Sequence, residues 1–136
     1  MNSGIMPILC IGETRVEHDA GEAEKIVQKQ LEIAFSLITK PYTLTPIIAY
    51  EPIWAISTEP GTTPDTPENA VKMIQYIKSL VGSEYTPNLI YVYGGSVNAH
   101  NAESFLREKD IEGALVGGAS LAEESIKKII EVAERY

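Results

Sequence analysis

The chain has 136 residues, enough for one domain, and its 44% hydrophobic and 22% charged residues exclude a disordered or fibrous protein. A net charge of -8 at pH 7 argues against nucleic acid and anionic membranes as partners. No apolar stretch approaches the roughly 20 residues of a membrane span, and Cys10, the only cysteine, cannot form an internal disulfide.

The expected location is a reducing cytoplasm, because residues 1–4 lack the basic and apolar regions of a signal peptide. Cys10 lies in an apolar run, where we expect a small buried hydrophobic residue rather than a nucleophile.

Strands and helices are predicted to alternate along the chain. Short apolar runs between turn signals predict buried strands, and apolar residues repeating at about 3.6 positions predict helices with one buried stripe. The expected strands are residues 7–11, 46–50, 89–93 and 114–116. The expected helices are residues 22–37, 67–81, 99–107 and 122–136.

Several helix starts carry capping signals. Thr66 precedes a proline at the first helical position, Ser120 and Glu123 have the spacing of a capping box, and Asn98 is a third candidate cap.

Four consecutive βα units imply an α/β fold with parallel strands and right-handed crossovers. Four strands are too few to close the usual eight-stranded barrel of about 250 residues. Periodicity alone therefore leaves two possibilities, a small open sheet or part of a barrel.

Glu51 is the most informative residue, because it directly follows the expected strand at 46–50. Barrel and open α/β enzymes work at the carboxyl ends of their strands, so a carboxylate there is well sited for proton transfer. On position alone, a glutamate facing solvent is the commoner outcome.

Four segments in order resemble the C-terminal half of the triose-phosphate isomerase family, its fifth to eighth βα units. They are PILCIGE at 7–13, AYEPIWAI at 49–56, YGGSVN at 93–98 and GALVGGASL at 113–121. The resemblance covers essentially the whole chain, residues 1–136, as a single domain that begins in mid-barrel. It implies half of a (β/α)8 barrel and an enzyme that interconverts dihydroxyacetone phosphate and glyceraldehyde 3-phosphate without metal or cofactor.

The resemblance also implies roles for particular residues. Glu51 would be the general base, and Pro52, Ile53 and Trp54 the hinge of a closing lid that excludes water. The substrate phosphate would lie against backbone amides, because glycine lets an anion approach closely and a helix start is positive. The residues in this phosphate-binding set are Ser57, Gly94, Gly95, Ser96, Gly117 and Gly118.

Two departures from the family pattern affect the expected activity. Ser57 replaces a lid glycine, and Glu59 adds a negative charge in a lid that is longer than usual. No segment resembles the first four units, which in the family carry an asparagine, a lysine, a histidine and a second glutamate of the site. We expect His18 and His100 to be solvated surface residues, and we expect the chain alone to be inactive.

The same pattern implies self-association, because half a barrel leaves two unpaired strand edges. We expect a homo-oligomer, with a dimer favoured. A closed ring of two copies, another oligomer and a flatter rearranged sheet all stay open. The alternative to an enzyme-derived half-site is a non-catalytic, phosphate- or sulfate-binding or self-associating half-barrel.

Overall fold

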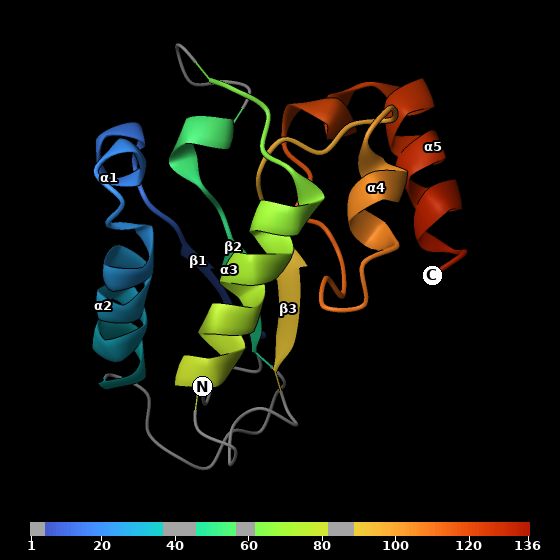
Figure 1. Ribbon diagram of the computed structural model, residues 1–136. Helices are drawn as coiled ribbons and strands as arrows, with labels where there is room; N and C mark the ends of the chain where they lie inside the picture. The colour runs from blue at the N-terminus through green and yellow to red at the C-terminus, as the bar shows by residue number, and fades with distance from the viewer. Residues whose placement is uncertain (1–4, 37–45, 57–61, 82–88) are drawn as a thin grey trace.

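The computed structural model describes residues 5–36, 46–56, 62–81 and 89–136 (Figure 1). Strands and helices alternate within these ranges, as the sequence predicts. The strands are β1 (Ile8–Ile11), β2 (Ile47–Tyr50) and β3 (Ile90–Tyr93). The helices are α1 (Arg15–Asp19), α2 (Ala23–Ser36), α3 (Pro67–Leu80), α4 (Ala102–Leu106) and α5 (Glu123–Ala133), with 3-10 turns at Ile53–Ala55 and Gly118–Leu121.

The three strands form a parallel sheet in the order β1-β2-β3, so the expected α/β class is confirmed. The expected fourth strand at 114–116 is reduced to one parallel bridge between Tyr93 and Ala114. Around it the Tyr93 amide donates to the Gly113 carbonyl at 3.1 Å, and the Leu115 amide donates to the Tyr93 carbonyl at 2.9 Å. The chain therefore continues the sheet in the predicted direction, but for too few residues to make a regular strand.

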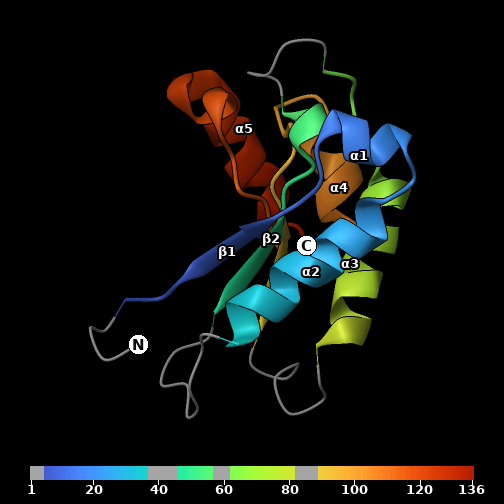
Figure 2. The same ribbon diagram turned by 90° about the vertical axis from the view of Figure 1, so that its left-hand side faces the viewer.

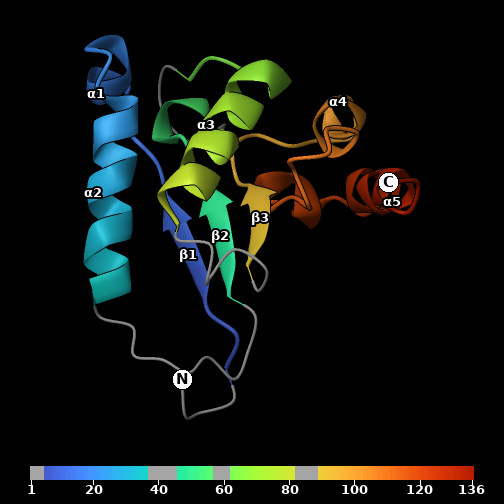
Figure 3. The ribbon, with the colours of Figure 1, turned by 60° about the horizontal axis from the view of Figure 1, so that its bottom comes forward.

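Helices α2 and α3 cover one face of the sheet (Figure 2). Figure 2 shows α2 and α3 on the same side of β1 and β2, and Figures 1 and 3 show α4 and α5 beyond β3. Alternate strand residues point into this helical layer, as the two-residue period of a strand requires. The buried core that results includes Ile11, Val27, Leu31, Ile48, Tyr50, Ile74, Ile77, Tyr91 and Tyr93.

The opposite face of β1 is open, and this corrects the prediction for Cys10. Cys10 is exposed, and Ile8 on the same face is 49% exposed. The apolar run led us to expect burial on both faces, but β1 is an edge strand. The face of β1 that carries Ile8 and Cys10 meets no helix among the described residues.

Helix starts follow the predicted capping chemistry in part. Thr66 caps α3 by accepting the Asn69 amide at 3.2 Å. Asn98 accepts the amides of His100 and Asn101, and so caps the turn before α4 rather than the helix itself. The expected capping box at the last helix is absent, because the Ser120 hydroxyl donates to the Gly117 carbonyl and Ala122 is the N-cap of α5.

The short helix α1 was not predicted, although its signal is in the sequence. Thr14 and Glu17 form a capping box, with the Thr14 side chain accepting the Glu17 amide and the Glu17 carboxylate accepting the Thr14 amide. In the parts of the chain that the structure describes, no helix is long and apolar enough to span a membrane.

Candidate active site

The parallel register brings Glu51 beside the first glycine pair. Ile11, Tyr50 and Tyr93 are partners across the sheet, so the residues that follow them emerge at one edge. The Glu51 amide donates to the Ile11 carbonyl and the Gly94 amide donates to the Tyr50 carbonyl, both at 2.7 Å. The ladder thus continues one residue past the strands.

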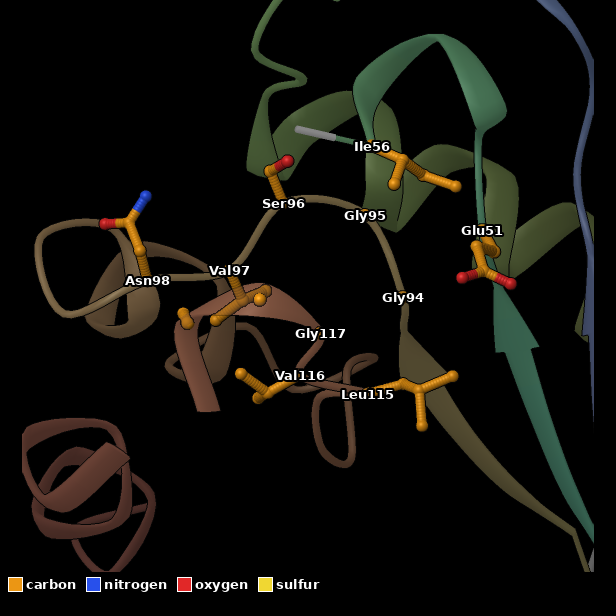
Figure 4. A pocket seen from close by; sticks show the side chains of 12 residues that line it. Glu51, Ile56, Gly94, Gly95, Ser96, Val97, Asn98, Leu115, Val116 and Gly117 are labelled. Atoms are coloured by element: carbon orange, nitrogen blue, oxygen red, sulfur yellow. The ribbon is translucent and has the colours of Figure 1, made fainter. Parts of the chain in front are cut away.

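Glu51 and both glycine pairs line one pocket of about 290 Å³ at this edge. Figure 4 shows the Glu51 side chain across the opening from the turn that carries Gly117. A Cβ built on Gly94 would lie 3.3 Å from the Glu51 Cβ, so glycine at that position leaves room for the carboxylate side chain. The pocket is lined by Glu51, Ile56, Gly94, Gly95, Ser96, Val97, Asn98, Leu115, Val116, Gly117, Gly118 and Ala119.

The predicted phosphate-binding residues differ in what they can offer an anion. Gly117 and Gly118 are exposed, and no described residue accepts their amides. The Ser96 amide already donates to the Ala55 carbonyl at 3.1 Å, and the Gly94 amide to Tyr50, so neither is available. The Ser96 hydroxyl is buried without a partner among the described residues, and it is therefore the group that Ser96 can contribute.

Gly95 is buried directly above the Tyr93 hydroxyl, and a Cβ there would overlap that oxygen. Tyr93 in turn stacks on Phe105, with ring centroids 4.4 Å apart. Burial, then the nearby Asp65 carboxylate, raises the pKa of Tyr93 well above its usual range, so the hydroxyl stays protonated. Only glycine fits at position 95 without moving this stack.

Trp54, the predicted hinge residue, is anchored by a buried carboxylate that the sequence analysis did not single out. Glu13 is fully buried, and it accepts the Trp54 indole N–H at 2.6 Å and the Tyr50 hydroxyl at 3.2 Å. Pro52 is also buried, whereas Ile53 is 39% exposed. The start of the hinge segment is therefore held by packing and by charge-assisted hydrogen bonds.

His18 is only partly solvated, with 35% of its side chain exposed, and it has contacts that we did not expect. Its ring lies 4.2 Å from the Trp54 ring, and its Nδ1 is 3.5 Å from the Glu13 carboxylate. The capping box that starts α1 turns His18 back over the indole, and this local signal was missed. His100 is exposed, as predicted.

Arg15 joins the two chain segments on either side of residues 57–61. Its Nη2 donates to the Trp54 carbonyl at 3.3 Å and to the Thr63 hydroxyl at 2.8 Å. Its guanidinium also lies over the Trp54 ring, 5.3 Å from the centroid. The predicted anion ligand Ser57 and the lid residue Glu59 lie outside the described residues.

Cys10 lies beside Glu51 on the open face. Partial burial, the Glu51 carboxylate and a hydrogen bond to that carboxylate raise the pKa of the Cys10 thiol. A thiol that stays protonated is a weak nucleophile, so the expectation that Cys10 is not a nucleophile agrees with its surroundings. Within the described ranges, no group of three His, Cys, Asp or Glu residues is arranged to hold a metal ion.

Comparison with known proteins shows the family of the chain. A family model described as triosephosphate isomerase matches residues 1–133. The chain belongs to the triosephosphate isomerase family.

Curated relatives carry the same name. The chain is 42% identical to a triosephosphate isomerase of Roseiflexus sp. (strain RS-1), over 93% of this chain and 50% of that protein. It is 41% identical to that of Buchnera aphidicola subsp. Schizaphis graminum, over 99% of this chain and 53% of that protein. The chain is also 41% identical to a triosephosphate isomerase of Aquifex aeolicus, over 96% of this chain and 52% of that protein. The chain thus spans about half the length of the curated relatives that it matches.

Asp65 lies just before α3, and the pKa of its carboxyl group can be tested by experiment. Burial raises the pKa of Asp65, although its Oδ1 accepts the Thr66 amide at 2.8 Å and the Asn69 side chain at 2.9 Å. Asp110 is the contrasting case, because hydrogen bonds from Lys78 and Gln75 lower its pKa.

Asp65→Asn is expected to change the pH dependence of stability. The folded chain holds the Asp65 proton more tightly than the unfolded chain, in which aspartate titrates at about pH 3.9. This stabilisation is complete below that pH and is lost as pH rises through the folded-state pKa. In urea unfolding from about pH 3 to about pH 7, wild type should therefore lose stability relative to Asp65→Asn.

Asp110→Asn is the matched control, with the opposite sign. Because the pKa of Asp110 is lowered in the folded chain, wild type should gain stability relative to this variant as pH rises. Parallel curves for wild type and Asp65→Asn would contradict the burial of that carboxyl.

Proposed function

We propose that this chain supplies the proton-transferring base and the anion cradle of a triosephosphate isomerase site. Glu51 would move a proton between the two adjacent carbons whose carbonyl and hydroxyl groups change places when dihydroxyacetone phosphate becomes glyceraldehyde 3-phosphate. The observation that carries the proposal is that Glu51 and the two glycine pairs line the same pocket. This is also the strand-end edge at which barrel enzymes place their chemistry.

The phosphate group of the substrate would lie against the turns at the far side of the pocket from Glu51. The amides of Gly95, Gly117 and Gly118 and the hydroxyl of Ser96 are the donors that support this assignment. Gly94 would serve instead as the space into which the Glu51 side chain fits. Among the described residues that line the pocket there is no lysine, arginine or histidine, so backbone and hydroxyl donors would provide the binding.

The segment Pro52-Ile53-Trp54 would be the fixed end of a lid over this pocket. The anchoring of Trp54 by Glu13, His18 and Arg15 supports a hinge whose base does not move when the rest of the lid does. Ser57 stays a proposed phosphate ligand from the sequence alone.

Phosphate binding tests the cradle directly. We expect ¹⁵N-detected titration with inorganic phosphate to shift the amide signals of Gly95, Gly117 and Gly118, with a Kd on the order of millimolar. Gly118→Pro removes one donor at the first position of a 3-10 turn, where proline is tolerated. Because a hydrogen bond to a charged group contributes about 1.5–3 kcal/mol, affinity should fall by roughly tenfold or more.

Gly118→Ala is the matched control, since it keeps the amide and its Cβ would meet nothing within 4 Å. It should bind phosphate about as well as wild type. Equal weakening in both variants, or no shift at the glycine turns of the wild-type chain, would count against the cradle.

Isomerase activity of the chain alone is expected to be undetectable. The lining residues that the structure describes include no lysine or histidine to stabilise the oxyanion that develops opposite Glu51, and loss of one such donor costs about 10²–10³ in rate. A coupled assay of purified chain should give the same rate as the Glu51→Gln variant. Turnover that scales with wild-type protein and disappears in Glu51→Gln would show that the half-site is sufficient.

We also propose that two copies of the chain associate through the unpaired edge of β1 and the face of β1 that carries Ile8 and Cys10. Ile5 and Met6 are 70% and 51% exposed and continue the apolar surface of Ile8 toward the chain start. The edge of β1 that faces away from β2 has no strand partner in the described part of the chain. A second copy would offer this surface both an apolar face and a matching strand edge, which is what an unpaired, apolar edge strand favours.

Light scattering should therefore give twice the 14.9 kDa of one chain at micromolar concentration. Ile8→Lys places a charge on the proposed contact and should give a monomer. Leu80→Lys, at an exposed position on the central helix α3, should remain dimeric. A monomeric wild-type chain would rule out the association.

A further inference from the structure

A single side chain on α2 holds the backbone just past the end of β1. The Gln30 carboxamide oxygen accepts the Gly12 amide at 2.9 Å, and its nitrogen donates to the Gly12 carbonyl at 3.0 Å. Gly12 is buried, so both of its backbone polar groups need a partner inside the protein. Gln30 satisfies both, as a neighbouring strand would.

Gly12 in turn packs directly on the peptide of Glu51. A Cβ built on Gly12 would overlap the Glu51 carbonyl and lie 3.0 Å from the Pro52 nitrogen. The residues on either side of Gly12 also contact this stretch: Ile11 accepts the Glu51 amide at 2.7 Å and Glu13 accepts the Ile53 amide at 3.0 Å. The end of β1 therefore fixes where the Glu51 main chain lies.

Gly12 cannot hold its own position without help. Glycine has the widest backbone freedom of any residue, and a buried amide or carbonyl left without a partner destabilises the folded chain. If the Gln30 carboxamide were absent, Gly12 would reorient to satisfy these groups, and the Glu51 peptide packed on it would shift. A displacement of about 1 Å is enough to impair a group that must meet a reacting atom.

We infer that Gln30 is a positioning residue for Glu51, acting through the backbone of Gly12. The inference rests on the proposed role of Glu51 for its importance to catalysis, but its physical content concerns only where Glu51 lies. It assigns to α2, which contributes no residue to the pocket, control over the direction of the carboxylate.

The test is a comparison by NMR of wild type, Gln30→Met and Val27→Ala. Methionine keeps the length of Gln30 and removes both hydrogen bonds. Val27 is fully buried on the same helix, so Val27→Ala weakens the packing of α2 without touching Gly12 hydrogen bonds. Signals of Glu51 are identified from their loss in Glu51→Gln.

In Gln30→Met we expect the Gly12 amide to exchange with solvent at least about fivefold faster, because the hydrogen bond that protects it is lost. We also expect the Glu51 amide and carboxyl signals to move. In Val27→Ala the chain should be less stable, while the Glu51 signals stay at their wild-type positions. Glu51 signals that move no further in Gln30→Met than in Val27→Ala would overturn the inference.

Gln30→Glu provides a second measurement if Gln30→Met fails to fold. A neutral carboxyl group has one acceptor and one O–H donor, so it can bind both polar groups of Gly12 as the amide does, whereas a carboxylate can only accept. The Gly12 and Glu51 amide signals should return toward wild-type positions as the new carboxyl is protonated, and signals that do not respond would contradict the inference. All of these measurements use the chain without ligand, so they test the role of Gln30 independently of phosphate binding and turnover.

Discussion

The parallel register of β1, β2 and β3 is the constraint on which the candidate site depends. Ile11, Tyr50 and Tyr93 end the three strands side by side, and two 2.7 Å hydrogen bonds carry the ladder on to Glu51 and Gly94. Because the side chains of Tyr50 and Tyr93 are almost fully buried under the helices, the strands cannot slip by one residue without turning both rings to the opposite face. The position of the carboxylate beside the glycine turn follows from this packing.

Several polar side chains near the pocket hold its surroundings in place, and none of them is among the residues that line it. Glu13 holds the Trp54 indole, Arg15 links the Trp54 carbonyl to Thr63, and Gln30 holds Gly12. Each lies on or next to α1 or α2, which contribute nothing to the pocket lining. The helices after β1 therefore support a site that is formed by the segments after β2, β3 and the bridge at Ala114.

The sequence predicted most of the strands and helices and the residues that line the pocket. It did not predict the side chains that hold the backbone around the pocket in place. Short apolar runs and 3.6-residue repeats predicted three strands and the three long helices closely, because burial on one face leaves a periodic record. The burial of Cys10 was wrong, since an apolar run does not reveal that β1 is an edge strand with one open face. Glu13 and Gln30 were missed because their partners are distant in the chain, and no local pattern links Gln30 to Gly12 or Glu13 to Trp54.

The most direct test of the central claim is a crystal structure of this chain grown with phosphate. We expect electron density for the Glu51 carboxylate directed into the pocket between Gly94 and Gly117, with an anion on the amides of the two glycine turns. A Glu51 side chain that turns away from both glycine turns, or glycine turns that do not share one pocket, would contradict it.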